Sequence, residues 1–287
     1  MNKNVALVLS GGGARGIAHI GVIEVLEENG FNISSVSGTS MGALVGAVYA
    51  LGKLPEFKEW LLNIDKLEIL KLVDFTFSTQ GFIKGDKIFK ELKRFIPDTK
   101  IENLKVSYSA IATDIMNKRE VVFTQGPIFD AVRASISIPS VFTPVKTPST
   151  MLIDGGTINN LPLDRVKRTK EDILIAVDVV ANVPFYETPK NESVYQKKIK
   201  KFQSYFDEMK SRKISAQLSY FEIIDKSINL MIEEIVKLKL KEYPPEVLIN
   251  ISQDASTLFD FYKAKEIIAY GREIAEEQIE NYINSKN

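Results

Sequence analysis

Short apolar runs alternate with amphipathic helical patterns along most of the chain. Runs bounded by turn residues predict strands at residues 5–9, 33–36, 106–112, 120–123, 151–153, 173–179 and 247–251. Apolar positions at three- and four-residue steps predict helices at residues 17–28, 42–51, 55–62, 87–95 and 127–134. This alternation predicts an α/β fold in which helices cover both faces of a central, mainly parallel sheet.

The pattern changes after Val183. Residues from about 190 to 243 carry no strand signal and predict two long amphipathic helices, the second ended by Pro244 and Pro245. A further strand and a final helix, from Thr257 to about Ile283, follow. We therefore expect a single domain over residues 1–287, with a core of about 4–183 plus 244–287 and a helical insertion at about 190–243.

Composition narrows the function classes. Hydrophobic residues make up 45% of the 287 residues and charged residues 26%, which is ordinary for a globular domain. Lys plus Arg equals Asp plus Glu at 37 each, so no net charge recruits nucleic acid. The absence of cysteine excludes disulfides, thiolate catalysis and cysteine metal sites. No apolar stretch approaches the roughly 18 residues that span a bilayer, and we expect a cytoplasmic protein, peripheral to a membrane at most.

The residues Gly38-Thr39-Ser40-Met41-Gly42 follow the second predicted strand and open a predicted helix. A Gly-x-Ser-x-Gly sequence in this context holds a serine hydroxyl on a tight, strained turn. The flanking glycines remove Cβ clashes at the bend, and the helix directs its positive end at the serine. Ser40 is therefore a candidate nucleophile.

A glycine-rich loop, residues 10–16, follows the first predicted strand. It can present several free backbone N–H groups at a helix start, where an oxyanion would be stabilised. The spacing of Gly11, Gly13 and Gly16 also matches a dinucleotide-binding fingerprint. That alternative expects a carboxylate at the end of the second strand. The strand ends in residues 35–38, Ser-Val-Ser-Gly, which favours the oxyanion interpretation.

The chain offers two candidate bases for Ser40. Its one histidine, His19, precedes Ser40, whereas a hydrolase of the serine–acid–histidine order needs a later one. We expect His19 to be a packed helix residue that bonds a backbone group. Asp154 ends the short strand 151–153 and begins an Asp-Gly-Gly turn, a position where α/β active sites collect. Asp154 is therefore the favoured base.

The glycine-rich loop 10–16, the Gly-x-Ser-x-Gly turn 38–42 and the Asp-Gly-Gly turn 154–156 follow one another in this order along the chain. Together they resemble the patatin-like phospholipase family of lipid acyl hydrolases. Residues 18–22 and 133–139 are also similar to that family. The resemblance covers about residues 4–183, and residues 247–271 resemble the closing strand and helix. The third motif is Asp-Gly-Gly where many members have Asp-Gly-Ala. The resemblance implies a three-layer patatin-like fold. Nothing in the sequence resembles a calcium loop or a zinc-ligand set, so we expect metal-independent chemistry and no cofactor.

The resemblance also implies roles for individual residues. Ser40 is the implied nucleophile and Asp154 the implied general base. The implied oxyanion hole consists of the backbone amides of Gly11, Gly12, Gly13, Ala14 and Arg15. The motif glycines are Gly16, Gly38, Gly42, Gly155 and Gly156. The implied reaction is hydrolysis of carboxylic esters of phospholipids, lysophospholipids or related lipids through an acyl-serine intermediate.

Three other functions stay open on the sequence alone. The same two catalytic residues suit a small-ester or acyl-thioester esterase, and a dinucleotide-binding protein or a catalytically silent interaction protein is more remote.

Arg15 either orients a lipid phosphate or braces the glycine loop. A carboxylate titrates near pH 4, so Asp154 is a weak base unless desolvated, and we expect oxyanion stabilisation to supply most of the rate.

Residues 196–213 form a candidate membrane contact. This segment holds seven basic and two acidic residues, and its apolar residues Ile199, Phe202, Phe206 and Met209 fall on one helical face. A basic amphipathic helix of this kind can lie in the interface of an anionic bilayer. The alternative is a solvated helix packed on the domain.

Overall fold

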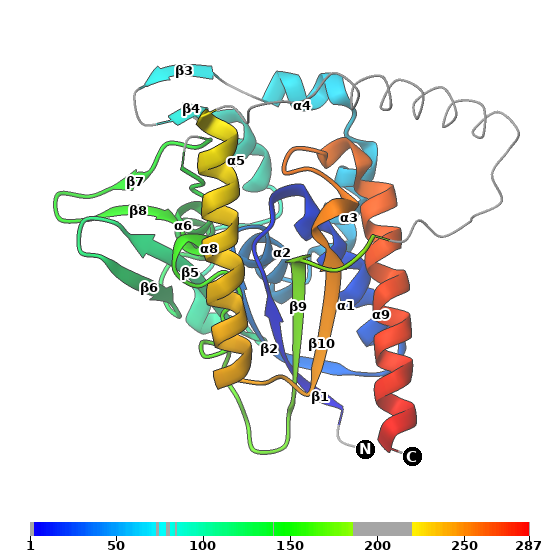
Figure 1. The fold of residues 1–287 in the computed structure, drawn as a ribbon. Helices are drawn as coiled ribbons and strands as arrows, with labels where there is room; N and C mark the ends of the chain where they lie inside the picture. Colours follow the sequence, from blue (N-terminus) through cyan, green and yellow to red (C-terminus); the bar gives the residue numbers. More distant parts are fainter. Residues whose placement is uncertain are drawn as a thin grey trace, which may run out of the picture.

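The computed structural model describes residues 3–72, 75–78, 81–83, 85–139, 141–185 and 220–286. Its centre is a mixed sheet of strand order β10-β9-β1-β2-β5-β8-β7, with β6 paired to β5 (Figure 1). The strands are β1 (Asn4–Leu9), β2 (Asn32–Thr39), β5 (Ser107–Asp114), β6 (Arg119–Phe123), β7 (Val145–Lys146), β8 (Met151–Asp154), β9 (Ile173–Ala181) and β10 (Val247–Ser252). Strands β3 (Phe75–Ser78) and β4 (Gly81–Ile83) form a separate antiparallel pair.

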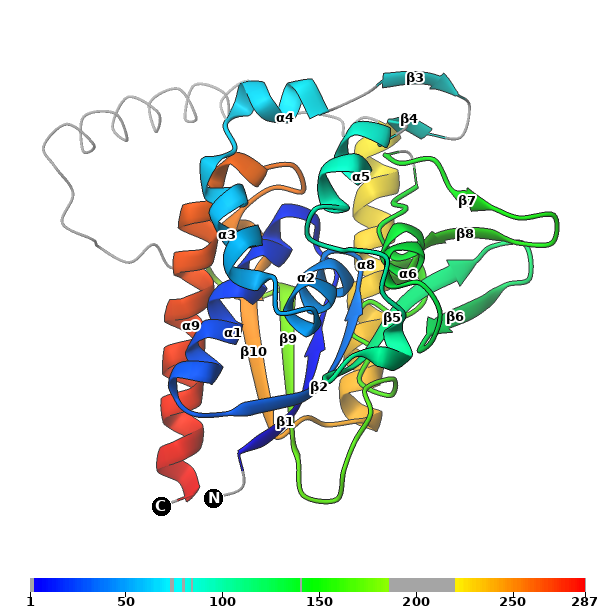
Figure 2. The ribbon, with the colours of Figure 1, turned by 180° about the vertical axis from the view of Figure 1, so that it is seen from behind.

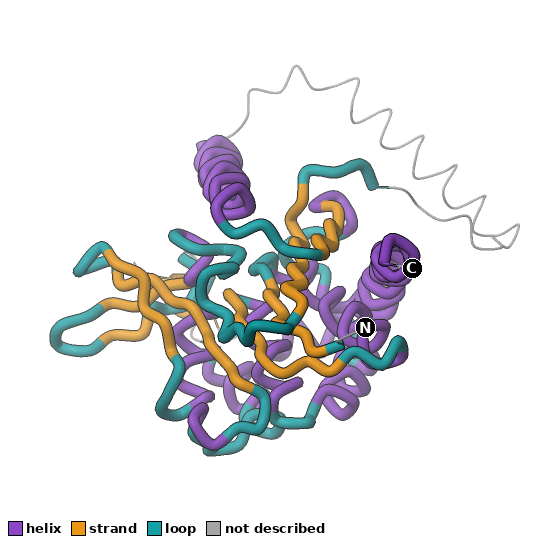
Figure 3. The backbone as a smooth tube through the Cα atoms, turned by 90° about the horizontal axis from the view of Figure 1, so that it is seen from below, coloured by secondary structure: helices purple, strands orange, loops and turns teal. Residues whose placement is uncertain are grey.

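Helices cover both faces of this sheet (Figures 1 and 2). The α-helices are α1 (Ala18–Glu28), α2 (Met41–Ala50), α3 (Leu54–Asn63), α4 (Lys66–Leu72), α5 (Asp86–Leu92), α6 (Ile128–Ser135), α8 (Tyr220–Glu242) and α9 (Ala264–Lys286). Short 3₁₀ turns are η1 (Gly13–Ile17), η2 (Ile101–Asn103), η3 (Gly155–Thr157), η4 (Gln253–Ala255) and η5 (Phe261–Lys263). The view from below shows helices on either side of the strands (Figure 3). The predicted α/β layered fold is confirmed.

Strand β1 shows why the two helical layers form. Val5, Leu7 and Leu9 belong to the larger apolar core, which α1, α2 and α9 complete on one face. Ala6 and Val8 belong to a smaller core on the other face. All five side chains are fully buried. A strand buried on both faces reads as a continuous apolar run, and this is the pattern expected for the middle of a parallel sheet.

Helix α8 supplies the second layer and connects β9 to β10. These two strands are parallel neighbours, so the chain between them must cross over the sheet. Val236 is buried against the smaller core, with Ile232 and Leu240 packed beside it. The second helix expected within residues 190–243 is thus a sheet-packing helix. The first, and the whole candidate membrane segment 196–213, lie outside the described residues.

The final helix begins later than the sequence pattern predicted. It was expected from Thr257, whereas α9 begins at Ala264. The Asp260 carboxylate accepts the Thr257 N–H at 3.0 Å and the Lys263 ammonium at 3.0 Å. These bonds stabilise a turn over residues 257–263, because a short acidic side chain competes with the helix for backbone donors.

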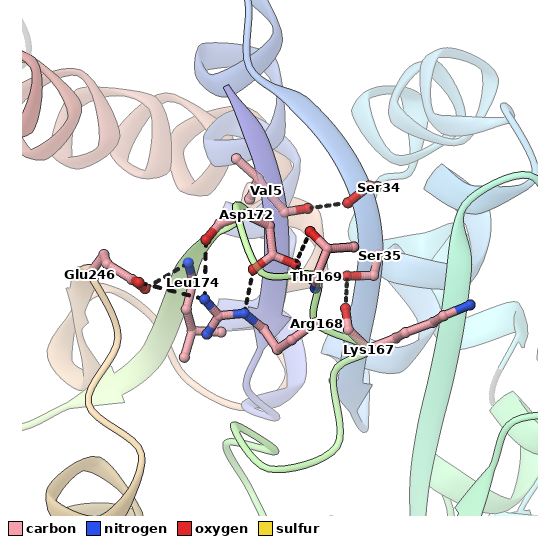
Figure 4. Close-up of polar contacts among 9 residues, drawn as sticks. All are labelled: Val5, Ser34, Ser35, Lys167, Arg168, Thr169, Asp172, Leu174 and Glu246. Carbon is pink, nitrogen blue, oxygen red and sulfur yellow. Dashed lines mark hydrogen bonds and ion pairs between the residues drawn. The ribbon is translucent and has the colours of Figure 1, made fainter. Parts of the chain in front are cut away.

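A polar cluster closes the amino end of the sheet (Figure 4). Arg168 Nε donates to Asp172 Oδ1 at 2.5 Å, and the same carboxylate accepts the Thr169 N–H. Glu246, directly before β10, accepts the Leu174 N–H at 2.7 Å. These contacts fasten the loop before β9 at one end of the sheet. The ends of β1, β2 and β8 that carry the three motifs lie at the opposite end.

Candidate active site

The register of β5 brings Ser40 and Asp154 together. Strand β2 runs parallel to β5 and its pairing ends at Thr39, opposite Ile111. Strand β8 runs antiparallel to β5, and Asp154 pairs with Ala112, the next residue. Strand β6 pairs with residues 110–114 of β5, and so occupies its other edge. Strands β2 and β8 therefore lie end to end along one edge of β5, and their last residues meet.

Ser40 sits in a strained turn. Its φ is 54° and its ψ −123°, in a region that non-glycine residues rarely adopt. Such a conformation costs about 1–3 kcal/mol and persists only where the surroundings hold it. The Ser40 N–H donates to Ser135 Oγ at 2.9 Å, and the Thr39 hydroxyl donates to the Asn159 carbonyl at 2.7 Å. This candidate nucleophile is buried, with 5% of the residue exposed.

The glycines around Ser40 allow close backbone packing. A Cβ at Gly42 would overlap the Leu9 carbonyl, and one at Gly38 would overlap the backbone of Gly42. Helix α2 can therefore begin directly against the end of β1. Gly16 lies against the Met41 side chain and Gly155 against the Ile111 carbonyl, so these motif glycines also lie at points of close approach.

Asp154 is a buried carboxyl with one oxygen available. Oδ1 accepts the Gly156 N–H at 2.8 Å. Oδ2 accepts no hydrogen bond of good geometry from any described residue, although the Ser40 hydroxyl lies near enough to lower the carboxyl pKa. Burial outweighs that effect and raises the pKa of Asp154 to about 6. Asp154 is therefore a stronger base than an exposed carboxylate, yet is still ionised at neutral pH.

Hydrogen bonds fix the glycine loop and occupy two of its predicted oxyanion donors. The Gly11 N–H donates to the Asn160 carbonyl at 3.2 Å, and the Ala14 N–H donates to the Leu258 carbonyl at 3.0 Å. Within the described chain, no carbonyl outside η1 accepts the N–H of Gly12 or Gly13. Of the five predicted oxyanion donors this leaves Gly12, Gly13 and Arg15, of which Gly12 and Gly13 directly follow Gly11. A Cβ at Gly11 would lie 3.0 Å from Ser40 Cβ, so the loop lies beside the candidate nucleophile.

Arg15 braces this loop. Its Nε donates to the Gln253 carbonyl at 2.7 Å, in the turn that follows β10. The bond ties the start of η1 to a segment far away in the sequence. It corresponds to the bracing role, one of the two considered for Arg15.

His19 packs under the loop. The side chain is fully buried, and Nε2 lies 2.9 Å from the Ser10 carbonyl oxygen. A carbonyl oxygen only accepts, so Nε2 carries the proton and donates it. Burial lowers the pKa of His19 to about 4, and the ring is neutral at pH 7. In the described residues neither ring nitrogen bonds Ser40 or Asp154. The structure gives His19 the packed, backbone-bonding place predicted for it.

Four further residues contact this region without having been candidate site residues, although Ser135 lies in the stretch 133–139 that resembles the family. Ser135, Asn159 and Asn160 bond the Ser40 turn or the glycine loop. Asp178, near the end of β9, is buried and interacts with the Ser10 hydroxyl, and burial raises its pKa to about 6. They are ordinary polar residues in the sequence, and only their position beside two strand ends sets them apart.

The described residues hold neither a metal-ligand cluster nor a membrane-spanning helix. Across the described ranges, no three histidine, aspartate or glutamate side chains group in a way that could hold a metal ion. None of the described helices has the length and apolarity required to cross a membrane.

Comparison with known proteins gives one family. The model of the patatin-like phospholipase family matches residues 7–167. An NTE family protein of Mycobacterium tuberculosis is 28% identical over an alignment of 333 residues, which covers 98% of this chain and 92% of that protein. Lysophospholipase nte1 of Aspergillus fumigatus is 34% identical over 185 residues, 62% of this chain and 12% of the fungal protein. Among solved structures, VipD of Legionella pneumophila is similar with a TM-score of 0.44 and 16% identity, over 96% of this chain and 67% of VipD.

Proposed function

This chain belongs to the patatin-like phospholipase family of lipid ester hydrolases, and from that premise we propose that it cleaves carboxylic esters of phospholipids or lysophospholipids with Ser40 as nucleophile and Asp154 as general base. The meeting of these two residues along one edge of β5 carries the proposal. A strained serine beside a desolvated carboxylate is the arrangement that activates a hydroxyl.

The reaction has two halves. Asp154 Oδ2 takes the proton of the Ser40 hydroxyl while Ser40 Oγ bonds the acyl carbon, and the carbonyl oxygen becomes an oxyanion. The N–H groups of Gly12 and Gly13 and the positive end of α2 stabilise that charge. The intermediate collapses, and the leaving alkoxide takes the proton from Asp154. A water molecule then gives its proton to Asp154, attacks the acyl-serine and releases the fatty acid, with the proton returned to Ser40.

Desolvation makes an aspartate adequate for this task. At its ordinary pKa of 3.8 the carboxylate would be a poor acceptor for a serine proton, and burial raises that pKa to about 6. Ionisation at neutral pH is retained. We expect most of the lowering of the activation barrier to come from the preorganised N–H donors, each of which contributes about 3–4 kcal/mol.

Turnover is expected to rise with pH through an apparent pKa near 6. Only the ionised form of Asp154 accepts a proton, so below this pKa each pH unit should lower kcat/KM about tenfold. The measurement is kcat/KM on a soluble ester from about pH 4.5 to about pH 8.5, because kcat/KM reports the pKa values of the free enzyme. Asp178 has a pKa raised to the same range, and Asp178→Asn serves as the control. The acid limb, by which we mean the fall in rate below this pKa, should persist in Asp178→Asn. Its disappearance there would assign the limb to Asp178 instead.

Lipid esters are expected to be better substrates than short soluble esters. The name of the Aspergillus relative supports lysophospholipids as a substrate class, since that protein is a lysophospholipase. Fatty acid release from lysophosphatidylcholine, phosphatidylcholine and a short-chain p-nitrophenyl ester tests this, with Ser40→Ala as the blank. A preference for the lipids by an order of magnitude or more in kcat/KM supports it. A preference for the short ester, or for an acyl thioester, would support the esterase alternative.

A peripheral membrane contact is part of the proposal. The candidate segment 196–213 lies outside the described residues. Two exposed apolar side chains on other segments support such a contact: Leu67 on α4 is 65% exposed and Phe259 is 57% exposed. Phe259 directly follows Leu258, whose carbonyl accepts the Ala14 N–H of the glycine loop. An apolar side chain at this position can enter a lipid surface beside the site.

A further inference from the structure

Asn160 lies between the glycine loop and the Asp-Gly-Gly turn. Its backbone carbonyl accepts the Gly11 N–H at 3.2 Å, and its side-chain Nδ2 donates to the Gly11 carbonyl at 3.3 Å. Both polar groups of one loop residue are thus bound to one asparagine, which is itself 5% exposed. The amides of Gly12 and Gly13 follow directly after this anchor point.

The same side chain lies near the candidate base. A Cβ at Gly11 would lie 2.5 Å from Asn160 Oδ1, and one at Gly156 would lie 2.9 Å from it. Glycine at both positions therefore leaves the space that this amide occupies. Asp154 Oδ1 lies 3.1 Å from that same point at Gly156, so the Asn160 and Asp154 oxygens are at most about 6 Å apart.

The neighbouring residue, Asn159, contacts the nucleophile turn. The Asn159 carbonyl accepts the Thr39 hydroxyl at 2.7 Å, one residue before Ser40. Residues 159 and 160 therefore contact the nucleophile turn, the glycine loop and the surroundings of the base. A loss of these contacts would change the relative positions of groups that must act together.

We propose, on the basis of the proposed function, that Asn160 is a positioning residue that holds the glycine loop against Ser40. Its side chain is an uncharged amide, so this contact places no second carboxylate beside Asp154. Among the described residues, the groups that the structure places against Asp154 are uncharged. They are the Ser40 hydroxyl, the Gly156 N–H, the Ser137 carbonyl, which accepts the Asp154 N–H at 2.9 Å, and the strand partner Ala112.

Two substitutions separate positioning from general support of the fold. In Asn160→Ser the hydrogen bond from the side-chain amide to the glycine loop is lost, and the rate constant for covalent reaction of Ser40 should fall about tenfold or more, with an unchanged acid limb. In Asn160→Asp a carboxylate is placed within about 6 Å of Asp154, and like charges at that distance disfavour ionisation. The acid limb should then move upward by about one pH unit. A merely structural role would not move it.

The readout is the rate constant for covalent reaction of a soluble fluorophosphonate with the protein, measured against pH. It needs no lipid, so absence of any reaction in the wild type would contradict the proposed function rather than the role of Asn160. Asn103→Asp is the matched control, since it adds the same charge at an exposed residue of η2 and should leave the profile unchanged. Thermal unfolding checks each variant.

The outcomes are distinct. A slower Asn160→Ser together with an upward-shifted Asn160→Asp supports the inference. A wild-type rate in Asn160→Ser, or a limb in Asn160→Asp within about 0.3 pH units of wild type, would overturn it. Should Asn160→Asp fail to fold, the rate constant of folded Asn160→Ser decides alone.

Discussion

Asp154→Asn is expected to lower kcat on a lipid ester by about 10⁴-fold, on the scale of changes to the acid of a serine hydrolase. The amide oxygen can still accept the Gly156 N–H, which Asp154 Oδ1 accepts at 2.8 Å. The amide nitrogen, in contrast, cannot take a proton from Ser40. The loss should therefore be chemical and the fold retained. Steady-state kinetics at pH 8 with thermal unfolding measures both.

The same variant is expected to be more stable than the wild type at pH 8. Burial raises the pKa of Asp154 from 3.8 to about 6, so the folded protein binds more protons than the unfolded chain between those values. Wild-type stability therefore falls as the pH rises through this window. Asparagine removes the cost, which is about 3 kcal/mol above pH 6 and vanishes near pH 4.

His19→Gln is the control for this experiment. Glutamine can supply an N–H to the Ser10 carbonyl in place of His19 Nε2, whose bond is 2.9 Å long. We expect substantial turnover to remain, with a stability loss of about 1–2 kcal/mol from the altered buried bond. The reverse pattern, an active Asp154→Asn and an inactive but folded His19→Gln, would replace the proposed pair with a serine–histidine arrangement.

Gly42→Ala is expected to cost both stability and turnover. The added Cβ would overlap the Leu9 carbonyl oxygen and lie 2.7 Å from the Ser10 carbonyl oxygen. Alanine gains about 1 kcal/mol of helix propensity, whereas overpacking against backbone costs about 1–3 kcal/mol or more. The cost of the steric overlap should therefore exceed the gain in helix propensity. We expect the backbone to relieve this overlap by moving the start of the glycine loop away from Ser40, and kcat should fall about 100-fold.

Gly46→Ala on the same helix is the matched comparison. There the new Cβ meets the Val36 Cγ1 methyl at 2.8 Å, and a side chain can shift where a strand backbone cannot. The gain in helix propensity from glycine to alanine is the same as at Gly42, and Gly46 lies more than a helical turn beyond Ser40. Melting temperature and kcat are measured for both variants. Equal effects at the two positions would contradict the assignment of Gly42 to the contact between β1 and the nucleophile turn.

Much of the fold could be predicted because burial leaves a strong pattern. The run 5–9 is apolar at every position since β1 is covered on both faces, and it was predicted nearly to its ends. Strand β7, of two residues, is too short to show any periodicity. The predicted start of α9 was wrong because the Asp260 carboxylate accepts the Thr257 N–H ahead of the helix. The spacing of apolar residues carries no information on such a bond.

The site was predictable only as separate pieces. Ser40 and Asp154 each end a strand, and this is visible in the sequence. Their proximity depends on β2 and β8 sharing one edge of β5, with Ile111 and Ala112 as successive partners, and that is a tertiary property. Ser135 and Asn160 were missed because their importance comes from the backbone groups they bond. The roles of Ser40, Asp154 and the glycine loop stay predictions.

The rate of covalent labelling of Ser40 by a fluorophosphonate tests the central claim most directly, with the adduct located by peptide mass mapping. The account predicts one adduct, on Ser40, that forms rapidly in the wild type at pH 8 and about 10³-fold or more slowly in folded Asp154→Asn. An adduct on another residue, or a wild-type labelling rate without the Asp154 carboxylate, would contradict it.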